Sequence, residues 1–179
     1  MPGDVPLEQT VPHENIVLTG FMGSGKTSVG KALAAVLRRE FVDTDAVIES
    51  RFGPIPTIFA EHGEDRFRAH ERALADEIAE GSGLVVSTGG GMLVDGAVAD
   101  RVASNGRVFC LTASPTTIIE RVRADGVADR PLLDTSDPEA TVALLLAERS
   151  GAYERFEAVP TDGRTVAEIV GDLIARMRS

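Results

Sequence analysis

The chain has 179 residues, 43% of them hydrophobic and 26% charged, with a formal net charge of −10 at pH 7. This length and apolar content suit one globular domain, while the negative charge argues against a nucleic-acid surface. The apolar runs are all too short for a membrane span, and residues 1–15 lack the basic-then-apolar pattern of a signal peptide.

These properties predict a cytoplasmic protein that binds neither nucleic acid nor membranes. We expect a flexible polar tail over residues 1–14, followed by a single domain over 15–179. The one cysteine, Cys110, lies in an apolar run and is expected to be a buried thiol in a strand. The cysteine and the three histidines do not have the spacing of a structural zinc site.

The first predicted strand, around 16–18, runs into the stretch G-F-M-G-S-G-K-T at 20–27. This stretch matches G-x-x-x-x-G-K-[ST] at every fixed position, and a helical pattern follows it, as a phosphate-binding loop requires. Glycines let backbone N–H groups converge on one point, where the start of the helix adds positive charge. Lys26 would reach the outer phosphates of a nucleoside triphosphate, and Thr27 would offer its hydroxyl to Mg²⁺. The predicted contacts are Gly23, Ser24, Gly25, Lys26, Thr27 and Ser28.

The next predicted strand, at 40–45, ends in two acidic residues, Asp43 and Asp45. In an open parallel sheet, ligands lie beyond the carboxyl ends of the strands, so both acids should face the phosphate loop. One could serve the metal and the other a second substrate. Alternatively, Asp45 could simply cap the helix that follows.

Helical spacing, broken by glycine and prolines at 53–56, continues to about residue 80. Most charges on such helices are solvated, but Arg68, next to Phe67, could point inward. A buried strand at 84–88 then runs into Gly89, Gly90 and Gly91. The three glycines would allow a small molecule to approach the main chain closely, although a flexible turn is the alternative.

Another buried strand, at 107–112, precedes a helix that starts after Ser114. The segment at about 123–135 is polar and bears arginines, so it could be a mobile lid over phosphates or a plain connecting loop. A helix at 138–149, a short strand near 157–160 and a helix at 166–177 complete the chain. The alternation of strands and helices predicts a three-layer α/β sandwich with a mainly parallel sheet.

Taken together in order and spacing, these segments resemble the shikimate kinase family. The resemblance is carried by G-F-M-G-S-G-K-T-S-V-G, F-V-D-T-D-A-V-I-E, I-F-A-E-H-G-E-D-R-F-R-A-H-E, S-T-G-G-G, R-P-L-L and R-S-G-A-Y. It implies a P-loop NTPase fold of the nucleoside-monophosphate-kinase type with a five-stranded parallel sheet. It also implies ATP-dependent phosphorylation of the 3-hydroxyl of shikimate, on the route to chorismate and aromatic amino acids. We expect a monomer.

By the same resemblance, the helical section at about 45–80 would bind the acceptor. Asp45 would hold the shikimate hydroxyls and help to prepare the attacking oxygen. Arg68 and Arg149 would clamp the shikimate carboxylate, and residues 89–91 would pack against the face of the ring.

On the nucleotide side, the resemblance assigns Thr27 and Asp43 to Mg²⁺, with Asp43 acting through water. Arg130 would fold down on the transferring phosphate as part of the lid, and Arg123 would contact adenine, which residues 160–164 would border. Together with Lys26, these residues would supply the positioning and charge neutralisation that phosphoryl transfer needs.

Two other functions would also use this phosphate loop. A kinase of the same fold could act on another hydroxy-acid such as gluconate, although the pairing of F-R-x-x-E with three glycines is not expected there. A catalytically silent relative would bind ATP without turnover. The intact Lys26, Asp45, Arg68 and Arg130 argue against this reading.

Overall fold

A computed structural model of the chain describes residues 13–125 and 135–178. Arg130 and most of the predicted lid at 123–135 therefore lie outside the described residues. The elements, in chain order, are β1 (Asn15–Thr19), α2 (Lys26–Leu37), β2 (Phe41–Asp43), α3 (Thr44–Phe52), α4 (Ile55–Glu80), β3 (Val85–Ser87), η1 (Met92–Val94), α5 (Gly96–Ala103), β4 (Gly106–Thr112), α6 (Pro115–Ala124), α7 (Pro138–Tyr153), β5 (Glu157–Pro160) and α8 (Val166–Met177).

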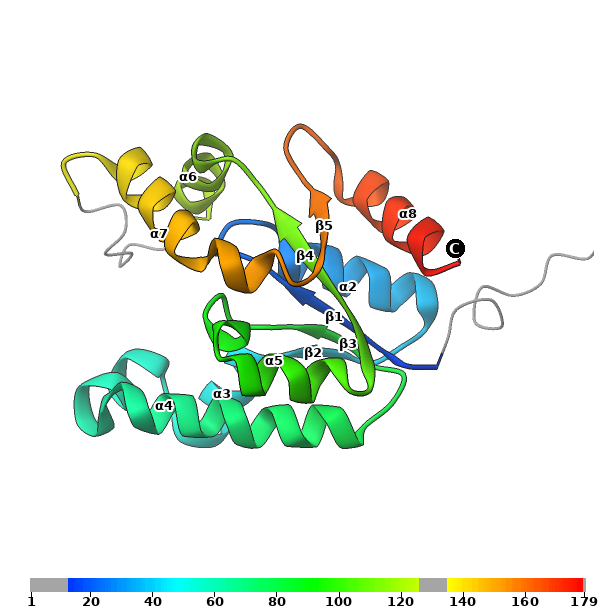
Figure 1. Cartoon of the computed structure of the whole chain (residues 1–179), viewed down its shortest axis with the longest axis horizontal. Helices are drawn as coiled ribbons and strands as arrows, with labels where there is room; N and C mark the ends of the chain where they lie inside the picture. Colours follow the sequence, from blue (N-terminus) through cyan, green and yellow to red (C-terminus); the bar gives the residue numbers. More distant parts are fainter. Residues whose placement is uncertain (1–12, 126–134, 179) are drawn as a thin grey trace, which may run out of the picture.

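The described strands form a five-stranded sheet in the order β2-β3-β1-β4-β5, and every neighbouring pair is parallel (Figure 1). β1 lies at the centre, where Val17 pairs with Val86 of β3 and with Val108 of β4. The carboxyl ends of all five strands therefore meet at one edge, where a doubly wound sheet binds its ligands. The predicted three-layer sandwich with a five-stranded parallel sheet is confirmed.

Alternate residues of the central strands pack against helices on opposite faces of the sheet. Ile16 and Leu18 of β1 belong to a core cluster shared with α2 and α8, whereas Val17 belongs to a cluster shared with α3, α4 and α5. Figure 1 shows the two helix layers, with α2 and α8 on one side of the sheet and α4 and α5 on the other. Cys110 of β4 is buried, as predicted, and burial raises the pKa of its thiol to about 11.

Two local features at the junction of β2 and α3 differ from the sequence predictions. β2 ends at Asp43, where its pairing with β3 ends, so Asp45 lies in the first turn of α3 and not in the strand. The N-cap of α3 is Asp43, whose carboxylate accepts a hydrogen bond from the Ala46 N–H, so the capping role considered for Asp45 was wrong. α4 runs from residue 55 to 80 through a kink at Gly63, which has φ 79°.

Among the described residues, we find no helix with both the length and the apolar composition needed to cross a bilayer.

Candidate active site

The loop between β1 and α2 turns on glycines in backbone conformations that other residues rarely adopt. Gly20 has φ 132°, and a Cβ there would lie 2.3 Å from the Leu111 carbonyl oxygen. Gly25, with φ 99°, is the N-cap of α2, and no side chain caps this helix. The N-terminal turn of α2 is therefore open to an anion, as in other phosphate-binding loops. Within the loop Ser24 is buried, while Thr27 and Ser28 are exposed on α2.

Lys26, the first residue of α2, folds back over this loop and is only 9% exposed. Its Nζ donates hydrogen bonds to the carbonyl oxygens of Gly20 (2.8 Å) and Phe21 (2.9 Å). Burial lowers the pKa of Lys26 to about 8, against the opposing attraction of Asp45 and other groups. The ammonium group is thus held at the phosphate loop by two uncharged acceptors. A bound phosphate would supply the negative charge that balances it.

Two acids from the β2–α3 junction lie beside the phosphate loop. The Thr27 hydroxyl donates a hydrogen bond of 3.0 Å to one Asp43 oxygen. The partly buried Asp45 also lines the cavity, and its pKa is raised by burial and then by Asp43, while Lys26 opposes the shift. Asp45 is therefore a more basic carboxylate than an exposed aspartate.

The three glycines after β3 each lie against one of the predicted substrate-binding side chains. A Cβ added to Gly89 would lie 2.5 Å from Asp45 Oδ1, and one added to Gly91 would lie 3.1 Å from Arg68 Nη1. The corresponding distance from Gly90 to Arg149 Nη1 is 3.8 Å. The glycines therefore make room for an acid and two arginines that come from three separate helices.

Arg68 points into the cavity because acidic residues of its own helix hold its guanidinium group. Its Nη1 donates to Glu71 at 2.7 Å and its Nη2 to Glu64 at 2.9 Å. Glu71 is almost fully buried, and burial raises the pKa of its carboxyl while Arg68 opposes that shift. Breaking this pair would leave the buried Glu71 carboxylate without its hydrogen bond to Arg68, so the guanidinium group is held in place.

Arg149 approaches the same glycines from α7. Its guanidinium group lies 5.3 Å from the centre of the Phe21 ring, and its Nη1 donates a long hydrogen bond of 3.4 Å to the Gly90 carbonyl oxygen. The hydroxyl of Tyr153, one turn later on α7, donates to the same carbonyl oxygen at 2.7 Å. The first and last residues of the R-S-G-A-Y motif thus contact the same carbonyl oxygen from one face of α7.

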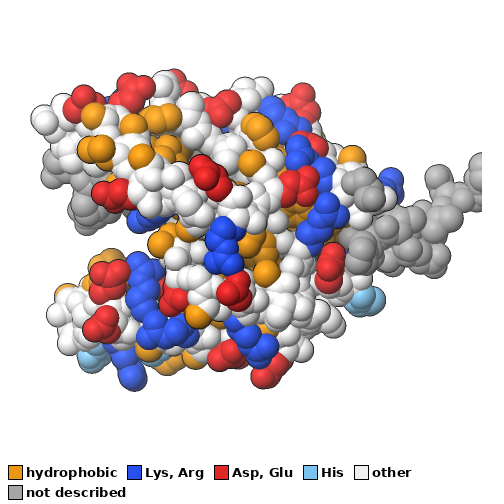
Figure 2. All heavy atoms as spheres, in the orientation of Figure 1, with side chains coloured by type: hydrophobic (Ala, Val, Ile, Leu, Met, Phe, Trp, Pro, Cys, Tyr) orange, Lys and Arg blue, Asp and Glu red, His pale blue; other side chains and the backbone are white. Residues whose placement is uncertain are grey.

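One cavity of about 710 Å³ is lined by residues 23–27 of the phosphate loop and α2, by Asp43, Asp45, Arg68 and Arg149, and by residues 89–91. In the space-filling view, the surface is hollowed between the parts built by α4 and α7 (Figure 2). One end of the cavity is formed by Asp45, Arg68, Arg149 and residues 89–91, and the phosphate loop lies beside them. The predicted acceptor and phosphate sites are therefore brought together.

The arginine predicted at the adenine site is placed differently. Arg123 is exposed near the end of α6 and is not among the described residues that line the cavity, which Arg121 does line. Residues two apart on a helix lie about 200° apart around its axis, so when Arg121 faces the cavity, Arg123 faces away from it. The cavity is also lined by Arg164, which lies between β5 and α8, and by Val166, the first residue of α8. Sequence reasoning missed Arg121, although its spacing of three from the buried Ile118 was the available signal.

Comparison with known proteins identifies the family of this chain. The family model for shikimate kinase matches residues 22–178. This chain belongs to the shikimate kinase family. It is 42% identical over 163 residues to the shikimate kinase of Pelotomaculum thermopropionicum, which covers 90% of this chain and 94% of the relative. It is 39% identical over 174 residues to that of Thermus thermophilus, covering 96% and 94% of the two chains.

Solved structures lead to the same family. A shikimate kinase from Acinetobacter baumannii in complex with shikimate superposes with a TM-score of 0.86 and 31% identity, covering 96% of this chain and 97% of that one. A gluconokinase from Sinorhizobium meliloti, with a TM-score of 0.63 and 22% identity, shows likeness of fold alone. The predicted enzyme class, a shikimate kinase that uses ATP, is confirmed, and the gluconate alternative is not favoured.

Proposed function

We propose that this shikimate kinase transfers a phosphoryl group from ATP to the 3-hydroxyl of shikimate within the 710 Å³ cavity. The observation that carries the assignment is the glycine triplet, against which one carboxylate and two guanidinium groups lie. An acceptor that bears both a carboxylate and ring hydroxyls would complement this set. The adjacent phosphate loop would place the donor within reach.

At the donor end, the loop glycines and the start of α2 would bind the triphosphate. Lys26 would exchange its two backbone carbonyl partners for phosphate oxygens, which are stronger acceptors for an ammonium group. Its charge would then neutralise part of the charge that develops during transfer.

Thr27 and Asp43 suit Mg²⁺ because both offer oxygen and already lie within hydrogen-bond distance. The described residues contain no cluster of three or more histidine, cysteine or acidic side chains, so phosphates and waters would have to complete the shell. We propose that these two residues hold the ion, Asp43 through water. When bound, Mg²⁺ would neutralise phosphate charge.

At the acceptor end, Arg68 and Arg149 would bind the shikimate carboxylate, and the main chain at 89–91 would allow the ring to approach closely. Asp45 would accept a hydrogen bond from the attacking hydroxyl. Because burial raises its pKa, it is better suited to take the proton than an exposed aspartate. Catalysis would therefore depend mainly on positioning and charge.

The roles of Arg123 at adenine and of Arg130 at the transferring phosphate remain predictions from the family resemblance, as do the monomeric state and the cytoplasmic location. Arg130 lies outside the described residues. An arginine at the transferring phosphate is expected to contribute strongly to the rate. The positioning of the substrates by the other residues would not make up for its loss.

ADP release in a coupled assay tests the function. Mg²⁺-ATP would be supplied with shikimate, with gluconate, or with no acceptor. We expect rapid turnover with shikimate alone. Turnover with gluconate alone would overturn the acceptor site, and ATP binding without turnover on either acceptor would indicate a catalytically silent protein.

A further inference from the structure

Arg121 joins two loops that lie far apart in the sequence. From α6, its Nη1 donates to the Gly23 carbonyl oxygen in the phosphate loop at 3.1 Å and to Thr161 Oγ1 at 2.9 Å. Its Nη2 donates to the Thr161 carbonyl oxygen at 2.8 Å. Thr161 lies in the connection between β5 and α8, which we call the β5–α8 loop (residues 161–165). One guanidinium group thus spans the phosphate loop and the β5–α8 loop.

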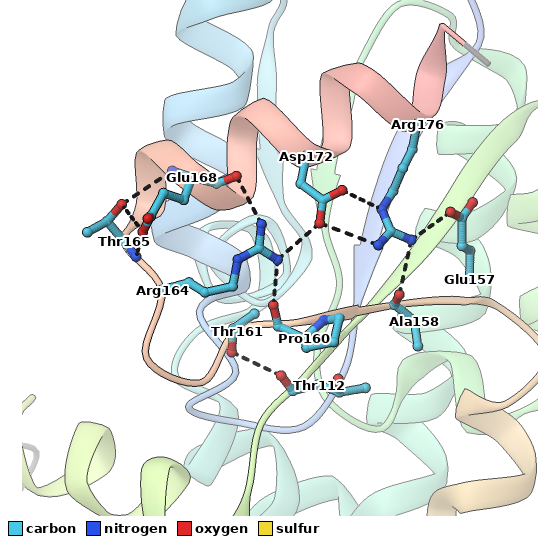
Figure 3. Close-up of polar contacts among 10 residues, drawn as sticks. All are labelled: Thr112, Glu157, Ala158, Pro160, Thr161, Arg164, Thr165, Glu168, Asp172 and Arg176. Atoms are coloured by element: carbon cyan, nitrogen blue, oxygen red, sulfur yellow. Dashed lines mark hydrogen bonds and ion pairs between the residues drawn. The ribbon is translucent and has the colours of Figure 1, made fainter.

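The partner of Arg121 in the β5–α8 loop is itself anchored to the sheet. Thr161 is fully buried, and both its N–H (2.9 Å) and its hydroxyl (3.0 Å) donate to the carbonyl oxygen of Thr112 at the end of β4. Figure 3 shows the hydroxyl contact beside the start of α8. Arg121 therefore links the phosphate loop to Thr161, a residue that cannot move without breaking its two hydrogen bonds to β4.

Further contacts hold the rest of the β5–α8 loop. Arg164 donates to the Pro160 carbonyl oxygen at 2.9 Å and to Asp172 at 3.0 Å (Figure 3). Asp162 accepts from the Ser114 N–H and hydroxyl, and hydrogen bonds from Thr117 and Ser114 lower its pKa to about 2. The loop is thus fixed to α6, to α8 and, through Arg121, to the phosphate loop.

Both of these loops border the cavity, at Gly23 on one side and at Arg164 on the other. A nucleoside triphosphate whose phosphates occupy the phosphate loop would extend along the cavity toward the β5–α8 loop with its nucleoside. We propose that Arg121 is a positioning residue for the nucleotide, which holds the phosphate loop and the β5–α8 loop at the spacing that ATP requires. The proposal rests on the proposed function only in that this end of the cavity binds ATP.

The guanidinium group is well matched to this task. Its planar fork presents several donors in fixed directions, so it can serve three acceptors on two loops at once. A lysine would keep the charge but has a single nitrogen on a flexible chain. We therefore expect Arg121→Lys to resemble Arg121→Met and not the wild type.

The test compares ligands that contact one loop or both. Dissociation constants for ATP, inorganic tripolyphosphate and shikimate would be measured by calorimetry, in the presence of Mg²⁺. For both Arg121 variants we expect ATP to bind about tenfold more weakly, the size of one lost charge-assisted hydrogen bond. Tripolyphosphate, which contacts only the phosphate loop, should stay within about twofold, and shikimate should be unchanged.

Two further variants complete the design. Arg101→Met removes an exposed arginine that pairs with Asp76, on the surface of α5 and α4, and should bind all three ligands as the wild type does. Thr161→Val removes one acceptor of Arg121 while keeping the guanidinium group and its charge. It should show a smaller loss that is again selective for ATP, and it carries the test if the Arg121 variants do not fold.

Equal losses for ATP and tripolyphosphate would overturn the proposal, because they would indicate a direct phosphate contact. Unchanged ATP affinity, or a parallel loss of shikimate binding, would overturn it too, the latter by indicating a general loss of structure. Wild-type protein that binds ATP without turning over shikimate would overturn the acceptor assignment alone. A wild type that does not bind ATP would overturn both.

Discussion

Replacing Gly89 by alanine should misplace Asp45. Gly89 does not have a positive φ, so the substitution introduces no backbone strain and acts only through its new methyl group. That methyl carbon would lie 2.5 Å from Asp45 Oδ1, whereas ordinary contacts begin at 3.4 Å. The carboxylate must therefore retreat by about 1 Å, a displacement that can lower the rate of an enzyme about 100-fold.

We expect kcat for shikimate phosphorylation to fall about 100-fold in Gly89→Ala, which corresponds to about 2.7 kcal/mol of activation free energy. The affinity for ATP should stay as in the wild type, because the phosphate loop is untouched. The assay is steady-state ADP release with each substrate varied in turn, together with direct measurement of ATP binding.

The matched control is Gly90→Ala, one residue along the chain. A Cβ at Gly90 would meet nothing closer than 3.5 Å, so Asp45 keeps its place. The new methyl group can raise the KM for shikimate, because it faces the acceptor, but kcat at saturating shikimate should stay within about threefold of the wild type. Equal kcat values for the two variants would refute the reasoning, because they would show that the contact between residue 89 and Asp45 does not set the rate.

Three other perturbations probe the same site. Asp45→Asn should lower kcat far more than ATP affinity, because the residue faces the acceptor; unchanged turnover would exclude its role as a base. Arg68→Ala should raise the KM for shikimate sharply, because a charge-assisted pair is lost, and a change in melting temperature alone would make Arg68 structural. Burial lowers the pKa of Lys26 to about 8, so its charge is lost in the free protein above that pH. ATP should therefore bind about tenfold more weakly at pH 9 than at pH 7, and a flat profile would contradict this.

The ionisation of Lys26 also affects the free energy of unfolding. Whereas ATP affinity should fall as the pH rises, the stability of the fold should increase. The pKa of Lys26 is about 8 in the folded chain, against an ordinary lysine value of 10.5, so the unfolded chain binds more protons between these values. Burying the charged lysine thus costs stability below pH 8, and that cost disappears as the pH rises from about 8 to 10.5. Lys26→Met should flatten this part of the pH–stability curve.

Features that depend on residues close together in the sequence were predicted well. The phosphate loop has its glycines at the positions where the backbone adopts positive φ, and its flanking strand and helix follow from their apolar spacing. The rule that ligands lie at the carboxyl ends of parallel strands brought Asp43, Asp45 and the three glycines to one edge. The end of β2 was missed, because a strand ends where its partner ends and not where its composition changes.

The sequence by itself determined the fold class, the phosphate loop and the family of this protein, because glycine positions and apolar periodicity act locally. The family resemblance named Arg68 and Arg149 for the site, but only the tertiary structure decided how the arginines of the cavity are held and that Arg121 is one of them. Arg68 enters the cavity because the buried Glu71 holds it, and Arg121 enters it while Arg123 faces outward. The direction of a long side chain on a helix depends on the acceptors that packing brings near it, and those acceptors come from segments up to 98 residues away.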